Sequence, residues 1–139
     1  MIGLLVVGHG DFAQTLVQSA NAIMGEQELL GAIGLLAEEG FADWKERLLT
    51  KLQEMVVAAG GDGVLVLVDL FGGTPGHGVL SIKSQLDTDR ICAITGANLG
   101  MLLEGIQMRE YLPLLELKTH CLTAGTGGIR DMMENGIES

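Results

Sequence analysis

The chain has 139 residues, of which 47 % are hydrophobic, and its 18 acidic and 8 basic residues give a formal net charge of −10. This length and apolar content suit one folded domain over residues 1–139 and exclude a disordered chain. No apolar run approaches a membrane span of roughly 20 residues, and the first residues lack a secretory signal, so we expect a cytoplasmic protein. The acidic balance argues against binding to nucleic acid or to an anionic lipid surface, because both need a basic patch.

The first half of the chain alternates short apolar runs with stretches of helical periodicity. Residues 2–7 are a continuous apolar run, typical of a strand buried on both faces, and residues 29–36 are a second strand candidate. Apolar residues recur at helical spacing over 12–24 and again over 41–56, and each of these stretches is followed by glycine, a common helix stop. The order strand, helix, strand, helix is therefore predicted up to about residue 60.

The second half continues the same alternation. Residues 63–71 give the strongest buried-strand signal in the chain, and 91–96 predict a fourth strand. Helices are predicted over 74–86 and 98–108. The first is expected to be capped by a threonine followed by proline, and the second by an asparagine.

The C-terminal part has weaker signals. Residues 87–89 (DTD) predict a turn, and Pro113 opens a last helical stretch to about residue 124. From Gly127 onward, the residues IRDM indicate either a short antiparallel edge strand or an irregular segment. The two cysteines, Cys92 and Cys121, sit among apolar neighbours and are interpreted as buried thiols.

Strands that alternate with helices through short connections favour an open, doubly wound, mainly parallel α/β sheet with helices on both faces, since parallel strands need helical crossovers. For the common strand order 2-1-3-4, strands one and three are neighbours at the point where the order reverses, and ligands bind beyond their carboxyl ends. His9 follows the first strand and Asp69 ends the third. We therefore expect these two side chains to face each other.

The expected pair has a chemical meaning. A carboxylate bonded to one imidazole nitrogen leaves the other nitrogen free as a nucleophile or base, and it stabilises positive charge on the ring. Glycines flank the histidine, Gly10 among them, and let a bulky reactant approach. Gly72 and Gly73 lie just beyond the aspartate, and Thr74 adds a hydroxyl at a helix N-terminus, which attracts anions. Together these residues outline a phosphoryl-acceptor site, although each signal alone is also typical of ordinary structure.

Three segments carry a family resemblance: VVGHGDFA, LVDLFGGTP and GANLGMLLE. In order and spacing the chain resembles, from Met1 to about Ile106, the IIA component of the mannose-type sugar phosphotransferase system. The resemblance implies a phosphotransferase in which His9 accepts a phosphoryl group from the phosphohistidine of the small histidine phosphocarrier protein. The group would then pass to the IIB component during sugar uptake. Asp69 would orient the ring and Thr74 would contact the phosphoryl group.

The resemblance also bears on partners and assembly. It implies a homodimer with an exchanged C-terminal strand, for which the tail of this chain is unusually polar. It implies no metal and no cofactor, and a link to the membrane only through the IIC and IID components. His120, Cys121 and Cys92 have no metal-ligand spacing.

Some residues near the expected site have two readings. Phe71 and Leu99 flank the strand ends and would serve either as an apolar collar for docking proteins or as core packing. His77 stands where the family commonly has asparagine, and it would either assist phosphoryl binding and docking or simply face solvent. Gly100 replaces a family proline, which would loosen that loop or alter its partner surface.

Other functions remain open at this point. A close relative in the same family passes phosphate to a dihydroxyacetone kinase. In that branch serine often flanks the histidine where Gly8 and Gly10 stand here, so the glycines favour sugar transport. A phosphorylation-state regulatory module would keep the same fold. A phosphate-binding protein for small molecules is a further alternative, but a nucleotide is disfavoured because the chain has no GxGxxG or Walker-type run.

Overall fold

The structure is a computed structural model and describes residues 1–86 and 88–135. Its strands are β1 (Gly3–His9), β2 (Leu30–Leu35), β3 (Val64–Val68) and β4 (Ile91–Thr95). Its helices are α1 (Phe12–Met24), α2 (Phe41–Ala59), α3 (Gly73–Leu86), α4 (Leu99–Met108), α5 (Leu114–Gly127) and the short α6 (Met132–Asn135), with a single 3₁₀ turn, η1 (Gly60–Asp62), among the described residues. Strands and helices alternate in the predicted order.

The four strands form one parallel sheet in the order β2-β1-β3-β4. The predicted fold class and strand order are therefore confirmed. Strand β1 pairs with β2 on one side and with β3 on the other, so the winding of the chain reverses between β1 and β3. At the carboxyl end of the sheet, Val7 lies opposite Val68 and His9 lies opposite Leu35. The carboxyl ends of β1, β2 and β3 therefore lie side by side at the same end of the sheet.

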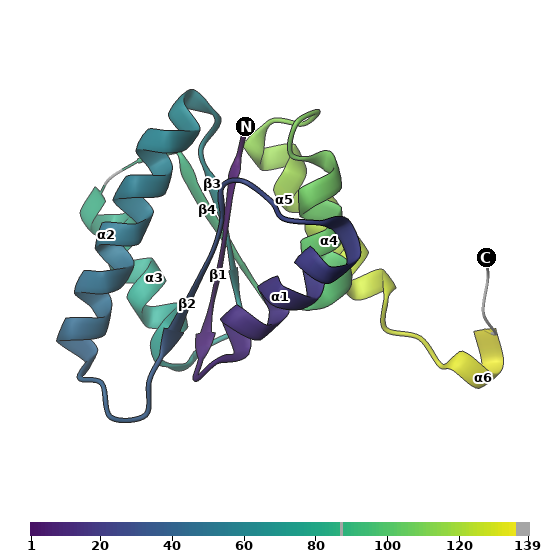
Figure 1. Cartoon of the computed structure of the whole chain (residues 1–139), viewed down its shortest axis with the longest axis horizontal. Helices are drawn as coiled ribbons and strands as arrows, with labels where there is room; N and C mark the ends of the chain where they lie inside the picture. The colour runs from purple at the N-terminus through teal and green to yellow at the C-terminus, as the bar shows by residue number, and fades with distance from the viewer. Residues whose placement is uncertain (87, 136–139) are drawn as a thin grey trace.

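Successive side chains along each strand point to opposite faces of the sheet and pack into two separate hydrophobic cores, one on each face. On one face, Leu4, Val6 and Leu65 pack with residues of α1, α4 and α5. On the other face, Leu5 and Val66 pack with residues of α2 and α3. Figure 1 shows the two helical layers with the sheet between them. Burial on both faces explains why the sequences of β1 and β3 are continuously apolar instead of alternating.

Local signals fixed some boundaries correctly and missed others. The predicted cap of α4 is confirmed, because Oδ1 of Asn98 accepts a hydrogen bond from the backbone N–H of Met101 at 3.0 Å. The predicted cap of α3 is wrong: the helix begins at Gly73, so Thr74 lies inside its first turn. Gly72 and Gly73 adopt φ of +85° and +77°, a left-handed backbone that glycine tolerates, and the helix begins two residues before Pro75, where the threonine–proline signal predicts its first helical residue.

The described part of the C-terminal tail contains no strand. Residues 129–131 are irregular, and Met132–Asn135 form the single turn of α6, which projects away from the sheet (Figure 1). The predicted turn at 87–89 includes residue 87, which lies outside the described residues. Both cysteines are buried and free, as expected. Among the residues described, no helix combines the length and apolar character needed to cross a bilayer.

Candidate active site

His9 and Asp69 meet at the carboxyl end of the sheet, where the winding of the chain reverses. His9 is the last residue of β1, and Asp69 directly follows the last residue of β3. Nδ1 of the imidazole lies 2.7 Å from Oδ2 of Asp69, and the backbone N–H of His9 donates to the same oxygen at 2.9 Å. The His9 side chain is 48 % exposed and the Asp69 side chain 11 %. The ring therefore stands in solvent while its carboxylate partner is largely covered.

The second oxygen of Asp69 is also engaged, since Oδ1 accepts the backbone N–H of Leu70 at 2.8 Å. Burial raises the pKa of Asp69, but the hydrogen bonds from His9 and Leu70 and the proximity of the imidazole together lower that pKa below its ordinary value. An ionised carboxylate only accepts hydrogen bonds, so a neutral ring must donate through Nδ1–H. The lone pair of the neutral imidazole is then on Nε2.

The free side of the ring faces the start of α3. A Cβ added at Gly73 would lie 3.5 Å from Cε1 and 3.8 Å from Nε2 of His9. The backbone N–H groups of the first helical turn, where Thr74 lies, have no partner within the helix and carry a partial positive charge. Nε2 thus lies next to a helix N-terminus that attracts anions.

The glycines beside His9 provide space. A Cβ at Gly8 would lie 3.1 Å from Oδ2 of Asp69, closer than nearly all such contacts, so the bare backbone at this position admits the carboxylate. Gly10 has φ of +56°, and a Cβ there would meet nothing within 4 Å. Its N–H donates to the carbonyl of Leu35 at 2.8 Å, so Gly10 leaves room for a reactant without serving as a hydrogen-bond donor to it.

Large apolar side chains are exposed at this end of the molecule. Phe71 is 93 % exposed, and Leu70 and Leu36 are each 57 % exposed. These three residues occupy the loops that follow β3 and β2, the strands on either side of β1. Leu99 differs from Phe71: it is partly buried and packs against the core on the α1, α4 and α5 face. Phe71 is therefore too exposed to serve as core packing, whereas core packing does describe Leu99.

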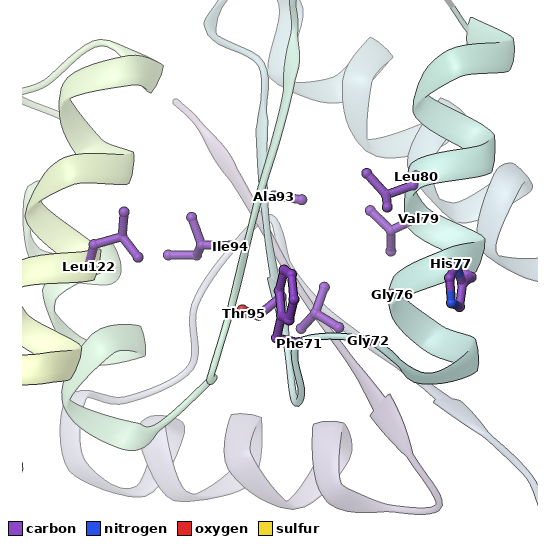
Figure 2. Close-up of a pocket in the computed structure, with 11 residues that line it drawn as sticks. Phe71, Gly72, Gly76, His77, Val79, Leu80, Ala93, Ile94, Thr95 and Leu122 are labelled. Carbon is purple, nitrogen blue, oxygen red and sulfur yellow. The ribbon is translucent and has the colours of Figure 1, made fainter.

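His77 lies on α3 and is exposed, but it lines a different feature of the molecule. An apolar groove of about 480 Å³ follows the outer edge of β4 between α3 and α5. In Figure 2, His77 and Leu80 come from α3, Leu122 comes from α5, and Ala93 lies on β4 between them. Phe71 and Gly72 close the groove at the end nearest the His9 site. Within the described residues, β4 pairs only with β3, so this edge of the sheet is open.

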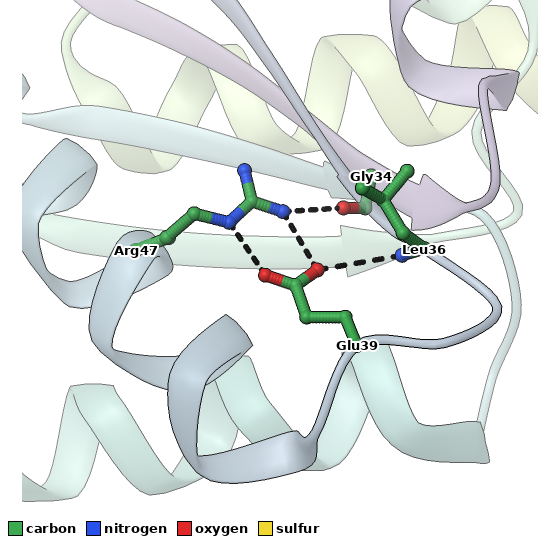
Figure 3. A network of polar contacts seen from close by, with 4 residues as sticks. All are labelled: Gly34, Leu36, Glu39 and Arg47. Carbon is green, nitrogen blue, oxygen red and sulfur yellow. Dashed lines mark hydrogen bonds and ion pairs between the residues drawn. The ribbon is translucent and has the colours of Figure 1, made fainter.

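An ion pair beside the site was not predicted. Arg47 of α2 binds Glu39 with two hydrogen bonds and also binds the carbonyl of Gly34 near the end of β2 (Figure 3). Charged residues on an amphipathic helix ordinarily indicate a solvated face, so the sequence pattern carried no signal for this contact.

Within the described residues, neither Cys121 nor His120 forms part of a second reactive centre. Burial raises the pKa of the Cys121 thiol to about 12, which keeps it protonated and unreactive. His120 faces Glu104 at 3.5 Å on the exposed side of α4 and α5. No cluster of three or more His, Cys, Asp or Glu side chains that could hold a metal ion occurs among the residues that the structure describes.

Comparison with known proteins gives consistent matches over most of the chain. The EIIA-man family model, described as the PTS system fructose IIA component, matches residues 3–121. The fructose-specific EIIA component of the PTS from Bacillus subtilis (strain 168) is 35 % identical over 117 residues, covering 84 % of this chain and 77 % of that protein. The mannose-specific EIIAB component from Escherichia coli (strain K12) is 28 % identical over 138 residues, and the match covers 99 % of this chain but 41 % of that longer protein.

A solved structure matches equally broadly. The crystal structure of phosphotransferase system component EIIA from Streptococcus agalactiae superposes with a TM-score of 0.84 at 29 % identity, covering 96 % of this chain and 99 % of that one.

Proposed function

Because this chain belongs to the EIIA-man family of phosphotransferase-system (PTS) components, we propose that His9 is its phosphoryl acceptor. In this proposal, His9 takes the group from the phosphohistidine of the histidine phosphocarrier protein and passes it to a IIB component for sugar uptake. The observation that carries the proposal is the arrangement of the imidazole. Its Nδ1 is held by Asp69, while the side chain is 48 % exposed with Nε2 on the side of the α3 N-terminus.

The transfer is a displacement at phosphorus. The lone pair of His9 Nε2 attacks the phosphorus of the donor, the N–P bond of the donor phosphohistidine breaks, and its electron pair returns to the donor ring. The His9 ring gains positive charge as its new N–P bond forms, and the ionised Asp69 stabilises that charge through Nδ1–H. Transfer to the acceptor protein is the same displacement with His9 as the leaving group. Positioning and charge neutralisation therefore supply most of the catalysis.

The phosphoryl oxygens are held by the start of α3. Gly72 precedes that helix and Gly73 and Thr74 lie in its first turn, whose unpaired N–H groups suit a dianionic group on Nε2. The Thr74 hydroxyl adds one further donor. Gly10, which has open space at its Cα, lets the donor and acceptor proteins approach the ring from the other side.

The two partner proteins dock around His9 on the apolar side chains at this end. Phe71 is the most exposed of them, and Leu70 and Leu36 extend the surface across the neighbouring loops. Large aromatic side chains are frequent anchors at the centre of protein interfaces. His77 borders this surface next to Phe71 and takes part in docking only at its margin.

The chain acts as a homodimer in this proposal. The apolar groove lies along the outer edge of β4 (Figure 2). This edge is open within the described residues, and an open sheet edge offers backbone N–H and C=O groups to an added strand. A second copy of the chain would supply that strand from its C-terminal segment, in which Ile129 and Met133 are 81 % and 93 % exposed.

The test is a phosphorylation assay with phosphoenolpyruvate, enzyme I and the histidine phosphocarrier protein. The native protein should gain the mass of one phosphoryl group in an acid-labile, base-stable form, and His9→Ala should abolish the gain. His120→Ala is a matched control, because His120 faces Glu104 away from the site, and it should retain the gain. A gain that survives in His9→Ala would contradict the proposal.

The acceptor distinguishes sugar uptake from the alternative functions. The phosphorylated protein should pass its group to a IIB component and not to a dihydroxyacetone kinase. Transfer to the kinase alone would move the chain to that branch of the family. Transfer to neither protein would favour a regulatory module.

A further inference from the structure

One guanidinium joins three segments near the end of β2. Nε and Nη2 of Arg47 donate to the two carboxylate oxygens of Glu39 at 2.7 and 2.8 Å, and Nη2 also donates to the carbonyl of Gly34 at 3.0 Å (Figure 3). Oε2 of Glu39 in turn accepts the backbone N–H of Leu36 at 3.4 Å. Helix α2, the 36–40 loop and the end of β2 are thereby tied to one another.

The geometry of this contact is specific, while its effect on global stability is small. Two parallel bonds between a guanidinium and a carboxylate define both distance and orientation. The hydrogen bonds from Arg47 are the main reason that the pKa of Glu39 lies below its ordinary value. The Arg47 side chain is nevertheless 47 % exposed, and ion pairs this close to solvent add little to the stability of a fold. The main effect of this ion pair is therefore on the position of the segments that it joins, α2, the 36–40 loop and the end of β2.

The end of β2 supports the turn that carries His9. His9 lies opposite Leu35 in the sheet, and the N–H of Gly10 donates to the carbonyl of Leu35 at 2.8 Å. A Cβ added at Gly34 would lie 1.9 Å from the carbonyl oxygen of Gly10, so the backbone of that turn rests directly on the bare Cα of Gly34. Displacement of Gly34 and Leu35 would thus be transmitted to Gly10 and to its neighbour His9.

We propose that Arg47 and Glu39 are positioning residues for phosphoryl transfer at His9, acting through the end of β2 and the backbone of Gly10. They touch neither the ring nor the reacting phosphorus. They hold the surface on which the His9 turn rests, so that the ring keeps its contact with Asp69 and its Nε2 faces the incoming group. The kinetic part of this inference rests on the proposed function, whereas the positioning of Gly10 does not.

The test compares Arg47→Gln and Glu39→Gln with Lys51→Gln. Lys51 is a matched control because it lies one turn further along α2 and packs against β2 at Gly31, where a Cβ would be 3.0 Å from its Cε. Two quantities are measured in each variant. One is the rate of phosphoryl transfer from the phosphorylated carrier protein as a function of its concentration, and the other is the hydrogen-exchange rate of the Gly10 amide.

Arg47→Gln and Glu39→Gln should each lower kcat by about tenfold while leaving KM for the carrier unchanged, because small displacements of a reacting group slow the chemical step. The Gly10 amide should exchange faster in both variants, since its acceptor Leu35 is no longer fixed. Arg47→Lys keeps the charge without the fork of two parallel bonds and should restore the rate only in part. Lys51→Gln should change neither quantity.

An unchanged kcat in Arg47→Gln and Glu39→Gln would overturn the inference, and so would an unchanged exchange rate at Gly10. A rise in KM alone would also overturn it, because the pair would then serve docking instead of positioning. If Lys51→Gln slowed transfer equally, the effect would belong to α2 as a whole and the inference would fail. If the native protein accepted no phosphoryl group, the proposed function would fail, and the Gly10 exchange rate would still decide whether the pair holds the turn.

Discussion

Oδ2 of Asp69 accepts hydrogen bonds from both the ring and the backbone N–H of His9, a residue 60 positions earlier in the chain. Two bonds to one oxygen fix the rotation of the imidazole relative to its own backbone. The contact forms because β1 and β3 are parallel neighbours at the point where the winding reverses, so both strands end on the same side of the sheet. The Asp69 carboxylate therefore joins the ends of β1 and β3 and, by binding Nδ1, leaves Nε2 as the free ring nitrogen.

Asp69→Asn should keep the fold and slow phosphoryl transfer to His9 by about 10²-fold or more. An asparagine amide that donates to Nδ1 places the ring proton on Nε2, and the nitrogen that should attack then has no lone pair. The initial rate of phosphorylation by the phosphorylated carrier protein measures the loss. The circular dichroism spectrum should match that of the native protein. Transfer at the native rate would show that the carboxylate does not orient the ring.

The pH dependence of stability should carry the signature of Asp69. Its pKa is lowered in the folded protein, so its contribution is fully present above the unfolded pKa of about 3.9 and is lost as the pH falls through the lower folded value. Urea unfolding of the native protein and of Asp69→Asn between about pH 2 and 6 isolates this residue from the other carboxylates. The difference in unfolding free energy should shrink toward the acid end, and a difference that stays constant would contradict the assignment.

Gly73 and Gly72 offer a matched pair of substitutions. Both have positive φ, so alanine at either position strains the backbone by about 1 kcal/mol. Only at Gly73 would the new Cβ also approach the imidazole, at 3.5 Å from Cε1. Gly73→Ala and Gly72→Ala should lose similar thermal stability, while Gly73→Ala should slow phosphorylation by a further factor of about ten. Equal rates in the two variants would exclude Gly73 from the surroundings of the phosphoryl group.

The expectations met by the structure come from patterns that repeat or converge. Continuous apolar runs predicted the strands, helical spacing predicted the crossovers, and these together place the end of β1 beside the end of β3. The adjacency of His9 and Asp69 followed from that topology, and the family resemblance of the motifs around the two residues implied the same pair. Asn98 was predicted correctly as a cap because the signal and its partner lie within one turn.

Features that depend on tertiary contacts were outside the reach of the sequence. Nothing in the spacing of Glu39 and Arg47 distinguishes a pair that holds a strand end from an ordinary solvated pair. The need for glycine at position 34 appears only when the carbonyl of Gly10 is known to lie against it. The burial of Leu99 likewise depends on how α4 packs against the sheet. Each of these facts involves elements that meet only in the folded chain.

Leu80→Glu should weaken the proposed homodimer. Leu80 lines the groove along β4 and is 67 % exposed in the single chain, so a second copy seated there would cover the new carboxylate and remove part of its hydration. The dissociation constant of the dimer, measured by sedimentation velocity over a range of concentrations, should rise at least about tenfold, equivalent to about 1.4 kcal/mol. Val57→Glu is the control, because Val57 is 82 % exposed on α2 and lies outside the groove. The β4 edge would not be the dimer interface if the native protein stayed monomeric at all concentrations. The same conclusion would follow if Leu80→Glu and Val57→Glu had the same dissociation constant.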